Sequence, residues 1–249
     1  MIDVYWQTYY TMEDARGYQR YRETRRSSHI VLSIEIDALH RLVQGSNPGE
    51  ILELGTGSGA MTKRIAAAYR CARIVGLDVS LSMLRLAQRA LSGREEKRRV
   101  DLILADAYHL PFRPSSFGFV LSTRLLTHLS ELGRILSQVG RILTEEGNLA
   151  FDFYNSDSFF MNVVRRIVLR ISYSMHRPGD VLKLVRESGF SRQDVIGRLM
   201  FGETVYEMLP SRVISLFEVF DRHLCSISTI ARYATRQFVL LRRLQPAKR

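Results

Sequence analysis

The sequence predicts an α/β fold in which a parallel sheet is covered by helices on both faces. From Gly49 to Phe153, short runs of Val, Ile and Leu alternate with amphipathic stretches, a pattern typical of strands buried on both faces. Within it, Ile51 to Asp78 predicts strand, glycine turn, helix and strand, which is a βαβ unit. The expected strands are 50–54, 73–78, 100–105, 117–122 and 148–153, and the expected helices are 59–69, 81–91 and 130–143.

The first turn of this unit, in the run ILELGTGSG, predicts a small-molecule site. Gly55 and Gly57 allow positive φ angles and let a ligand approach where no Cβ intervenes, and Gly59 is expected to let the helix pack closely on the strand. Asp78 ends the second strand, where a carboxylate can accept both hydroxyls of a ribose.

Two kinds of ligand compete for this turn. Gly55, Gly57 and Ala60 satisfy the dinucleotide pattern G-x-G-x-x-G/A, which favours NAD. Glu53 argues against it, because a carboxylate two residues before the first glycine opposes a pyrophosphate at the helix N-terminus. It suits a ligand that carries an ammonium and a sulfonium.

Three motifs together resemble the class I S-adenosylmethionine-dependent methyltransferase family. They are ELGTGSG at 53–59, GLDVSLSMLRLAQ from Gly76 and LILADAYHLPF from Leu102, and the resemblance extends from about Arg22 to Phe153. Two departures are small: Glu146-Gly147 replaces the family's usual Pro-Gly, and Thr123-Arg124 is a variant of a variable stretch. The resemblance implies a Rossmann-like, seven-stranded, mostly parallel sheet of order 3-2-1-4-5-7-6, with an N-terminal helical cap and S-adenosyl-L-methionine as cofactor.

The resemblance also implies roles for individual residues. Asp78 would bind the ribose, Asp106 the adenine amino group and the Ser122 carbonyl the cofactor ammonium, while Tyr21 and Arg26 would cover the methionine end. His128 is the candidate general base, and Tyr154 and Asn155 are expected to contact the acceptor. The full expected cofactor set is Tyr21, Arg26, Glu53, Gly55, Thr56, Gly57, Gly59, Asp78, Val79, Met83, Asp106, Ala107 and Ser122.

The length of 249 residues fits one domain in three parts. Residues 1–46 would form the helical cap, 47–153 the cofactor-binding core, and 154–249 an acceptor-side insertion, the last helices and a C-terminal hairpin. In the last part we expect an Arg-bearing amphipathic helix at 159–173, helices at 176–190 and 213–224, and strands at 193–201 and 236–244.

Composition limits the class of protein. With 46% apolar and 24% charged residues, no apolar run of eighteen and no basic, apolar N-terminal leader, the sequence predicts a cytoplasmic globular protein. Cys71 and Cys225 form no framework, and no metal-ligand spacing is present. The net charge of +11 makes nucleic acid or peripheral membrane contact possible, but the Arg residues are scattered and solvated faces are favoured.

Three functions follow as hypotheses, the first of which is methyl transfer to oxygen, nitrogen or carbon of a small molecule. Its variant has a lipid or quinone acceptor at a membrane surface. The second is RNA methylation, which rests on charge alone. From a different class, the chain could be a non-catalytic cofactor-binding scaffold or an NAD-dependent oxidoreductase. The acceptor and the oligomeric state are not specified by the sequence.

Overall fold

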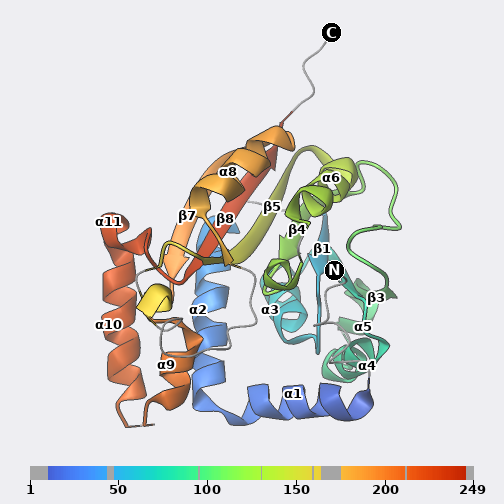
Figure 1. Cartoon of the computed structure of the whole chain (residues 1–249). Coiled ribbons are helices and arrows are strands. Elements are labelled where there is room, and N and C mark those ends of the chain that lie inside the picture. The colour runs from blue at the N-terminus through green and yellow to red at the C-terminus, as the bar shows by residue number, and fades with distance from the viewer. Residues whose placement is uncertain are drawn as a thin grey trace.

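The fold is described from a computed structural model that covers residues 11–43, 48–94, 96–129, 131–158, 160–163, 175–210 and 212–244. One mixed sheet runs through the molecule in the order β3-β2-β1-β4-β5-β8-β7, with the short β6 paired to β5 (Figure 1). Its strands are β1 (Glu50–Leu54), β2 (Arg73–Asp78), β3 (Val100–Leu104), β4 (Phe117–Ser122), β5 (Leu143–Asn155), β6 (Met175–His176), β7 (Phe190–Arg198) and β8 (Arg236–Arg243).

The predicted fold class and strand order are confirmed. Without the two-residue β6, which the sequence analysis did not predict, the order is the expected 3-2-1-4-5-7-6. Strands β1 to β5 pair in parallel, and β8 lies antiparallel between β5 and β7. Because the first five strands share one direction, their carboxyl ends meet at one edge of the sheet, where ligands of such folds bind.

Successive side chains of a strand point to opposite faces of the sheet. Because both faces of this sheet are apolar, helices cover both of them. Leu52 and Leu54 of β1 pack toward α6 and α8, whereas Ile51 packs toward α2 and α3. The helices are α1 (Met12–Thr24), α2 (Arg26–Val43), α3 (Ala60–Ala68), α4 (Leu81–Ala90), α5 (Glu96–Arg99), η2 (Leu126–His128), α6 (Leu132–Ile142), α8 (Pro178–Glu187), α9 (Gly202–Met208), α10 (Ile214–Ser226) and α11 (Ser228–Ala231).

Helix α1 is the part of the expected cap that bears on the site. It begins at the N-cap Thr11, whose hydroxyl accepts from the Asp14 N–H at 3.1 Å. It runs beneath the sheet from α2 to α4 (Figure 1), and its buried Ala15 packs against Met83 and Leu86 of α4. The cap therefore touches the helix that follows the candidate ribose-binding Asp78.

Two expected segments differ from the structure. The strand expected at 193–201 occupies 190–198 instead, in pairing with β8. The basic helix expected at 159–173 falls mostly outside the described residues, although 160–163 are helical. None of the helices in the described ranges combines the length and the apolar character needed to cross a membrane.

Candidate functional site

The turn between β1 and α3 has the backbone that its glycines predict. Gly55, Gly57 and Gly59 have φ of 76°, 54° and 82°, and the Gly55 N–H donates to the Leu77 carbonyl at 2.8 Å. A Cβ on Gly57 would meet no atom within 4 Å, so this glycine faces open space. A Cβ on Gly55 would lie 3.0 Å from the Leu125 Cβ. The turn therefore offers a ligand an open approach at Gly57 and is closed by Leu125 at Gly55.

The role expected for Gly59 was wrong. A Cβ at this position would lie 3.0 Å from the Cα of Ala87, which belongs to α4. Gly59 thus makes room for the close approach of α4 to the turn, rather than for packing of α3 on its own strand.

Glu53 lies inside the turn. Its carboxylate is buried, and its Oε2 accepts hydroxyl hydrogen bonds from Thr56 at 2.9 Å and Thr62 at 2.5 Å. Gly76 on β2 leaves space for this arrangement, because a Cβ there would lie 2.5 Å from the Thr56 hydroxyl. Glu53 therefore ties the turn to α3, a role that the sequence analysis did not predict.

The protonation state of Glu53 bears on which ligand the turn can accept. Burial raises the pKa of this carboxyl to about 7, although the two threonine hydroxyls oppose the shift. A group that is half protonated near neutral pH opposes a pyrophosphate less than a fixed anion would. The charge argument against NAD is therefore weaker than the sequence indicated.

Asp78 lies at the carboxyl end of β2, beside the turn. Its Oδ2 accepts from the Gly57 N–H at 2.8 Å and its Oδ1 from the Ser80 N–H at 2.9 Å. Burial raises the pKa of Asp78, against these backbone donors. Each carboxylate oxygen can accept more than one hydrogen bond, so a diol can still be bound.

Apolar surface surrounds Asp78. Val79 follows Asp78 and is 44% exposed. Leu104, the Cα partner of Asp78 on β3, is 54% exposed. Leu81, at the start of α4, is 49% exposed. Exposed aliphatic side chains at the carboxyl ends of β2 and β3 provide a surface on which a flat ring can lie. Val79 was among the residues expected from the sequence to bind the cofactor, whereas Leu81 and Leu104 were not.

Asp106 follows β3 with its carboxylate half exposed. Its Oδ1 accepts from the Tyr108 N–H at 2.8 Å, and its Oδ2 lies 3.3 Å from the His109 Nδ1. Arg134 can only donate, so its contact of 2.6 Å with the His109 Nε2 makes that nitrogen an acceptor. His109 therefore bridges Asp106 to α6, and the neighbouring Ala107 is buried.

Ser122 and His128 lie on the other side of the turn. Ser122 ends β4 as the Cα partner of Leu54, and within the described part of the chain its buried Oγ has no hydrogen-bond partner. His128 ends η2, with its N–H donating to the Leu125 carbonyl at 2.9 Å. Both residues thus flank the loop whose Leu125 contacts Gly55.

The two residues expected at the acceptor are both buried. The Asn155 amide donates to the carbonyls of Arg232 at 2.9 Å and Ala234 at 3.0 Å, and it has no exposed surface for a substrate. The Tyr154 hydroxyl donates to Glu203 at 3.4 Å, which places this ring beside α9.

Tyr21 and Arg26 connect the cap to the C-terminal helices. The Tyr21 hydroxyl donates to the Glu207 carboxylate on α9, and Arg26 donates to the Ser215 hydroxyl on α10 at 2.7 Å. Burial and Glu207 raise the pKa of Tyr21 to about 12. Their contact with a bound ligand stays a prediction.

A buried ionic network occupies the carboxyl ends of β4 and β5. Arg236 of β8 pairs with Asp152 of β5, Glu35 of α2 and, at 2.8 Å, Glu203 of α9. Arg124, which has a φ of 61°, donates from its backbone to Asp152 at 2.8 Å and from its Nε to Glu35 at 2.7 Å. Asp152 falls within the strand expected at 148–153, and Arg124 within the stretch that the resemblance treats as variable, so neither was expected to form an ion pair.

The electrostatics of this network follow from burial and mutual charge. Burial alone would raise the pKa of Glu35, but the charges of Arg124 and Arg236 lower it to about 2. The carboxylates of Asp152 and Glu35 hold the pKa of Arg236 well above its usual range, against burial. Burial raises the pKa of Asp152, although the charge of Arg236 and the Arg124 N–H lower it, so Glu35 is the carboxylate that the two guanidinium groups hold most strongly in its charged form.

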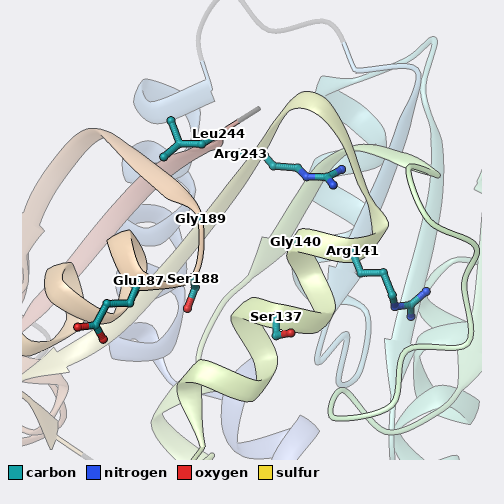
Figure 2. Close-up of a pocket in the computed structure, with 8 residues that line it drawn as sticks. All are labelled: Ser137, Gly140, Arg141, Glu187, Ser188, Gly189, Arg243 and Leu244. Atoms are coloured by element: carbon teal, nitrogen blue, oxygen red, sulfur yellow. The ribbon is translucent and has the colours of Figure 1, made fainter. Parts of the chain in front are cut away.

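A shallow pocket of about 720 Å³ lies at the opposite edge of the sheet. Figure 2 shows Arg141 of α6, the Ser188-Gly189 turn and the end of β8 around it. Arg141 donates to the carbonyls of Leu110 and Phe112, and Arg243 to that of Leu143. Because β8 is antiparallel to β5, its last residues lie far from the glycine turn, so this pocket is separate from the candidate site.

Comparison with known proteins identifies the domain that holds the candidate site. Residues 52–151, which contain the glycine turn, Asp78, Asp106 and Ser122, match the model of a methyltransferase domain family. Residues 52–151 therefore carry a methyltransferase domain, and the sheet around them has the fold of class I S-adenosylmethionine-dependent methyltransferases. Within the described ranges, no group of three or more His, Cys, Asp and Glu is placed to hold a metal ion.

Curated relatives match the chain over its core. A malonyl-[acyl-carrier protein] O-methyltransferase of Geobacter sulfurreducens is 40% identical over 91 residues, which are 36% of this chain and 33% of that protein. A demethylmenaquinone methyltransferase of Thermotoga maritima is 30% identical over 111 residues, 43% of this chain and 46% of that protein. The chain therefore spans less than half of the length of the curated relatives that it matches.

Solved structures of other methyltransferases share the fold over nearly the whole chain. A possible histamine N-methyltransferase from Thermotoga maritima has a TM-score of 0.66 at 18% identity, covering 96% of this chain and 99% of that one. Magnesium protoporphyrin IX methyltransferase from Synechocystis PCC 6803, solved with bound S-adenosylhomocysteine, has a TM-score of 0.64 at 16% identity, covering 92% and 94%. At such identities the likeness concerns the fold.

Proposed function

We propose that the chain transfers a methyl group from S-adenosylmethionine to a small molecule. The observation that carries the proposal is that residues 52–151 match a methyltransferase domain and that the fold places the glycine turn, Asp78 and Asp106 of this segment at one edge of the sheet. The names of the curated relatives support it, since they include methyltransferases for a malonyl thioester carrier and for a quinone.

The described residues fit this cofactor. Gly57 faces open space, and the Ser122 hydroxyl is buried without a partner in the described part of the chain. Asp78 would accept the ribose hydroxyls, and Val79 with Leu104 would contact the adenine near Asp106. The turn and Ser122 would then face the methionine end. Glu53 would act indirectly, by holding Thr56 and α3 in place.

When bound, S-adenosylmethionine would supply a methyl group that its sulfonium already activates for transfer to a lone pair of the acceptor. The protein must align the acceptor and exclude water, which can contribute roughly 7–11 kcal/mol. His128 is our candidate to take a proton from an acceptor that needs to lose one.

The first test is isothermal titration with S-adenosylmethionine, S-adenosylhomocysteine and NAD. We expect micromolar binding of the first two, and Asp78→Ala should weaken it by about 100-fold or more, because two ribose hydroxyls lose a charged acceptor. Asp101→Ala is a matched control, since this exposed carboxylate on β3 pairs only with Arg73 across the strands in the described contacts. Binding of NAD alone would show that the cofactor is a dinucleotide.

A second test uses the open glycine. Gly57→Ala should cost only about 1 kcal/mol of stability, because its positive φ disfavours a side chain but no atom is displaced. Cofactor affinity should fall at least 10-fold, because the new methyl group occupies the approach to the turn. Urea unfolding and titration on the same samples would separate these effects, and unchanged affinity would exclude a ligand at Gly57.

A further inference from the structure

The ionic network at the ends of β4 and β5 has an inner and an outer part. The inner part is balanced, since two carboxylates, Glu35 and Asp152, face two guanidinium groups, Arg124 and Arg236. The outer part adds a third carboxylate, Glu203, and a third guanidinium, Arg22 of α1, whose atoms lie 4.0 Å apart.

Glu203 is held differently from the inner carboxylates. Glu35 and Asp152 are fully buried and each accept several charged or backbone donors. The Glu203 side chain is 21% exposed and stands on the short helix α9, which starts at Gly202 with a φ of 74°. Its bonds are one to Arg236 at 2.8 Å and a longer one from Tyr154 at 3.4 Å.

The guanidinium groups of Arg22, Arg124 and Arg236 form a corner that borders the glycine turn. Arg124 immediately precedes Leu125, whose side chain is the one that a Cβ on Gly55 would meet. Val79, which follows β2, and Leu104, at the end of β3, are the residues proposed to contact the adenine, and they lie on the other side of β1 in the sheet. The corner formed by Arg22, Arg124 and Arg236 is therefore on the side of the turn left for an acceptor.

We propose that this corner binds a carboxylate of the acceptor, and that Glu203 occupies the position of that carboxylate in the absence of the acceptor. Without the Glu203 side chain, three guanidinium groups face two carboxylates, and the excess positive charge lies next to the buried Arg236. A planar carboxylate is the ligand that matches guanidinium donors. That the bound carboxylate belongs to a methyl acceptor rests on the proposed function, but binding of an anion at this corner can be tested without the cofactor.

The test is rescue of a cavity variant by acetate. Glu203→Ala should unfold at a lower temperature than the wild type, and about 200 mM sodium acetate should raise its melting temperature by about 3 °C relative to chloride at equal ionic strength. Acetamide, which has the same shape and no charge, should raise it by less than about 1 °C. The wild type should respond less to acetate, because Glu203 competes for the site.

Glu207→Ala is the matched control. Glu207 lies on the same helix and accepts from Tyr21, but no guanidinium contact of its carboxylate is found among the described ion pairs. Acetate should not rescue it. Equal rescue of both variants, or rescue of neither, would overturn the proposal. If Glu203→Ala does not fold in chloride, the same comparison is made on refolding from urea into acetate or acetamide.

A second arm tests the acceptor itself in the full protein with S-adenosylmethionine. Production of S-adenosylhomocysteine should be faster with carboxylic acids than with the corresponding primary amides. Turnover confined to acceptors without a carboxylate would overturn the proposal while leaving methyl transfer intact. If, by contrast, S-adenosylmethionine does not bind in the titration of wild type and Asp78→Ala, the proposed cofactor is wrong, but the acetate rescue of Glu203→Ala is unaffected.

Discussion

Arg236→Met should lower the free energy of unfolding by about 3–5 kcal/mol, because it leaves two buried carboxylates without their shared cation. Arg236 has no exposed surface and bonds to Asp152, Glu35 and Glu203. Methionine has a similar volume and tolerates varied packing, so most of the loss reflects charge. Urea unfolding followed by far-ultraviolet circular dichroism measures it.

Arg242→Met provides the control on the same strand. Arg242 is exposed on β8 and lies outside the network, so this substitution should change the free energy of unfolding by less than about 0.5 kcal/mol. A loss below about 1 kcal/mol in Arg236→Met would mean that water or rearranged side chains already compensate the buried charges.

Glu53→Gln should abolish a pH dependence of stability that the wild type shows below neutrality. Burial raises the pKa of Glu53 from the ordinary 4.5 to about 7. Between these values the folded state binds more protons than the unfolded state, so the wild type loses stability as pH rises. The full change is about 3 kcal/mol, reached above pH 7.

The measurement compares wild type and Glu53→Gln by urea unfolding at several pH values from roughly 4.5 to 8. The glutamine oxygen can accept the same two threonine hydrogen bonds. The variant should therefore gain relative stability as pH rises and exceed the wild type above pH 7. A constant difference between the two proteins across this range would show that Glu53 keeps an ordinary pKa.

The sequence predicted the sheet and the cofactor edge because both depend on local patterns. Strands such as 50–54 and 73–78 carry short runs of Ile, Leu and Val next to the turn, and the glycines at 55 and 57 are required by the positive φ angles of the turn. Asp78 and Asp106 follow strand ends, so their place at one edge followed from the parallel topology.

What was missed depends on contacts between distant segments. The network joins Glu35, Arg124, Asp152, Glu203 and Arg236, which lie on four separate elements and one loop and share no spacing. The one available sign was a charge within an apolar segment, as with Arg236 at the start of β8. Gly59 was assigned to the wrong neighbour because a turn alone does not show that α4 passes over it.

The place of β8 in the sheet also bears on how the protein is made. This strand comes last among the described elements, yet it is inserted between β5 and β7 and carries Arg236 into the network. The half-sheet from β1 to β4 needs only contacts within 50–122 and can form while the chain is still being synthesised. Asp152 and Glu35 can pair with Arg124 before β8 is made, but they acquire Arg236 only after β8 has left the ribosome, so the network is completed last.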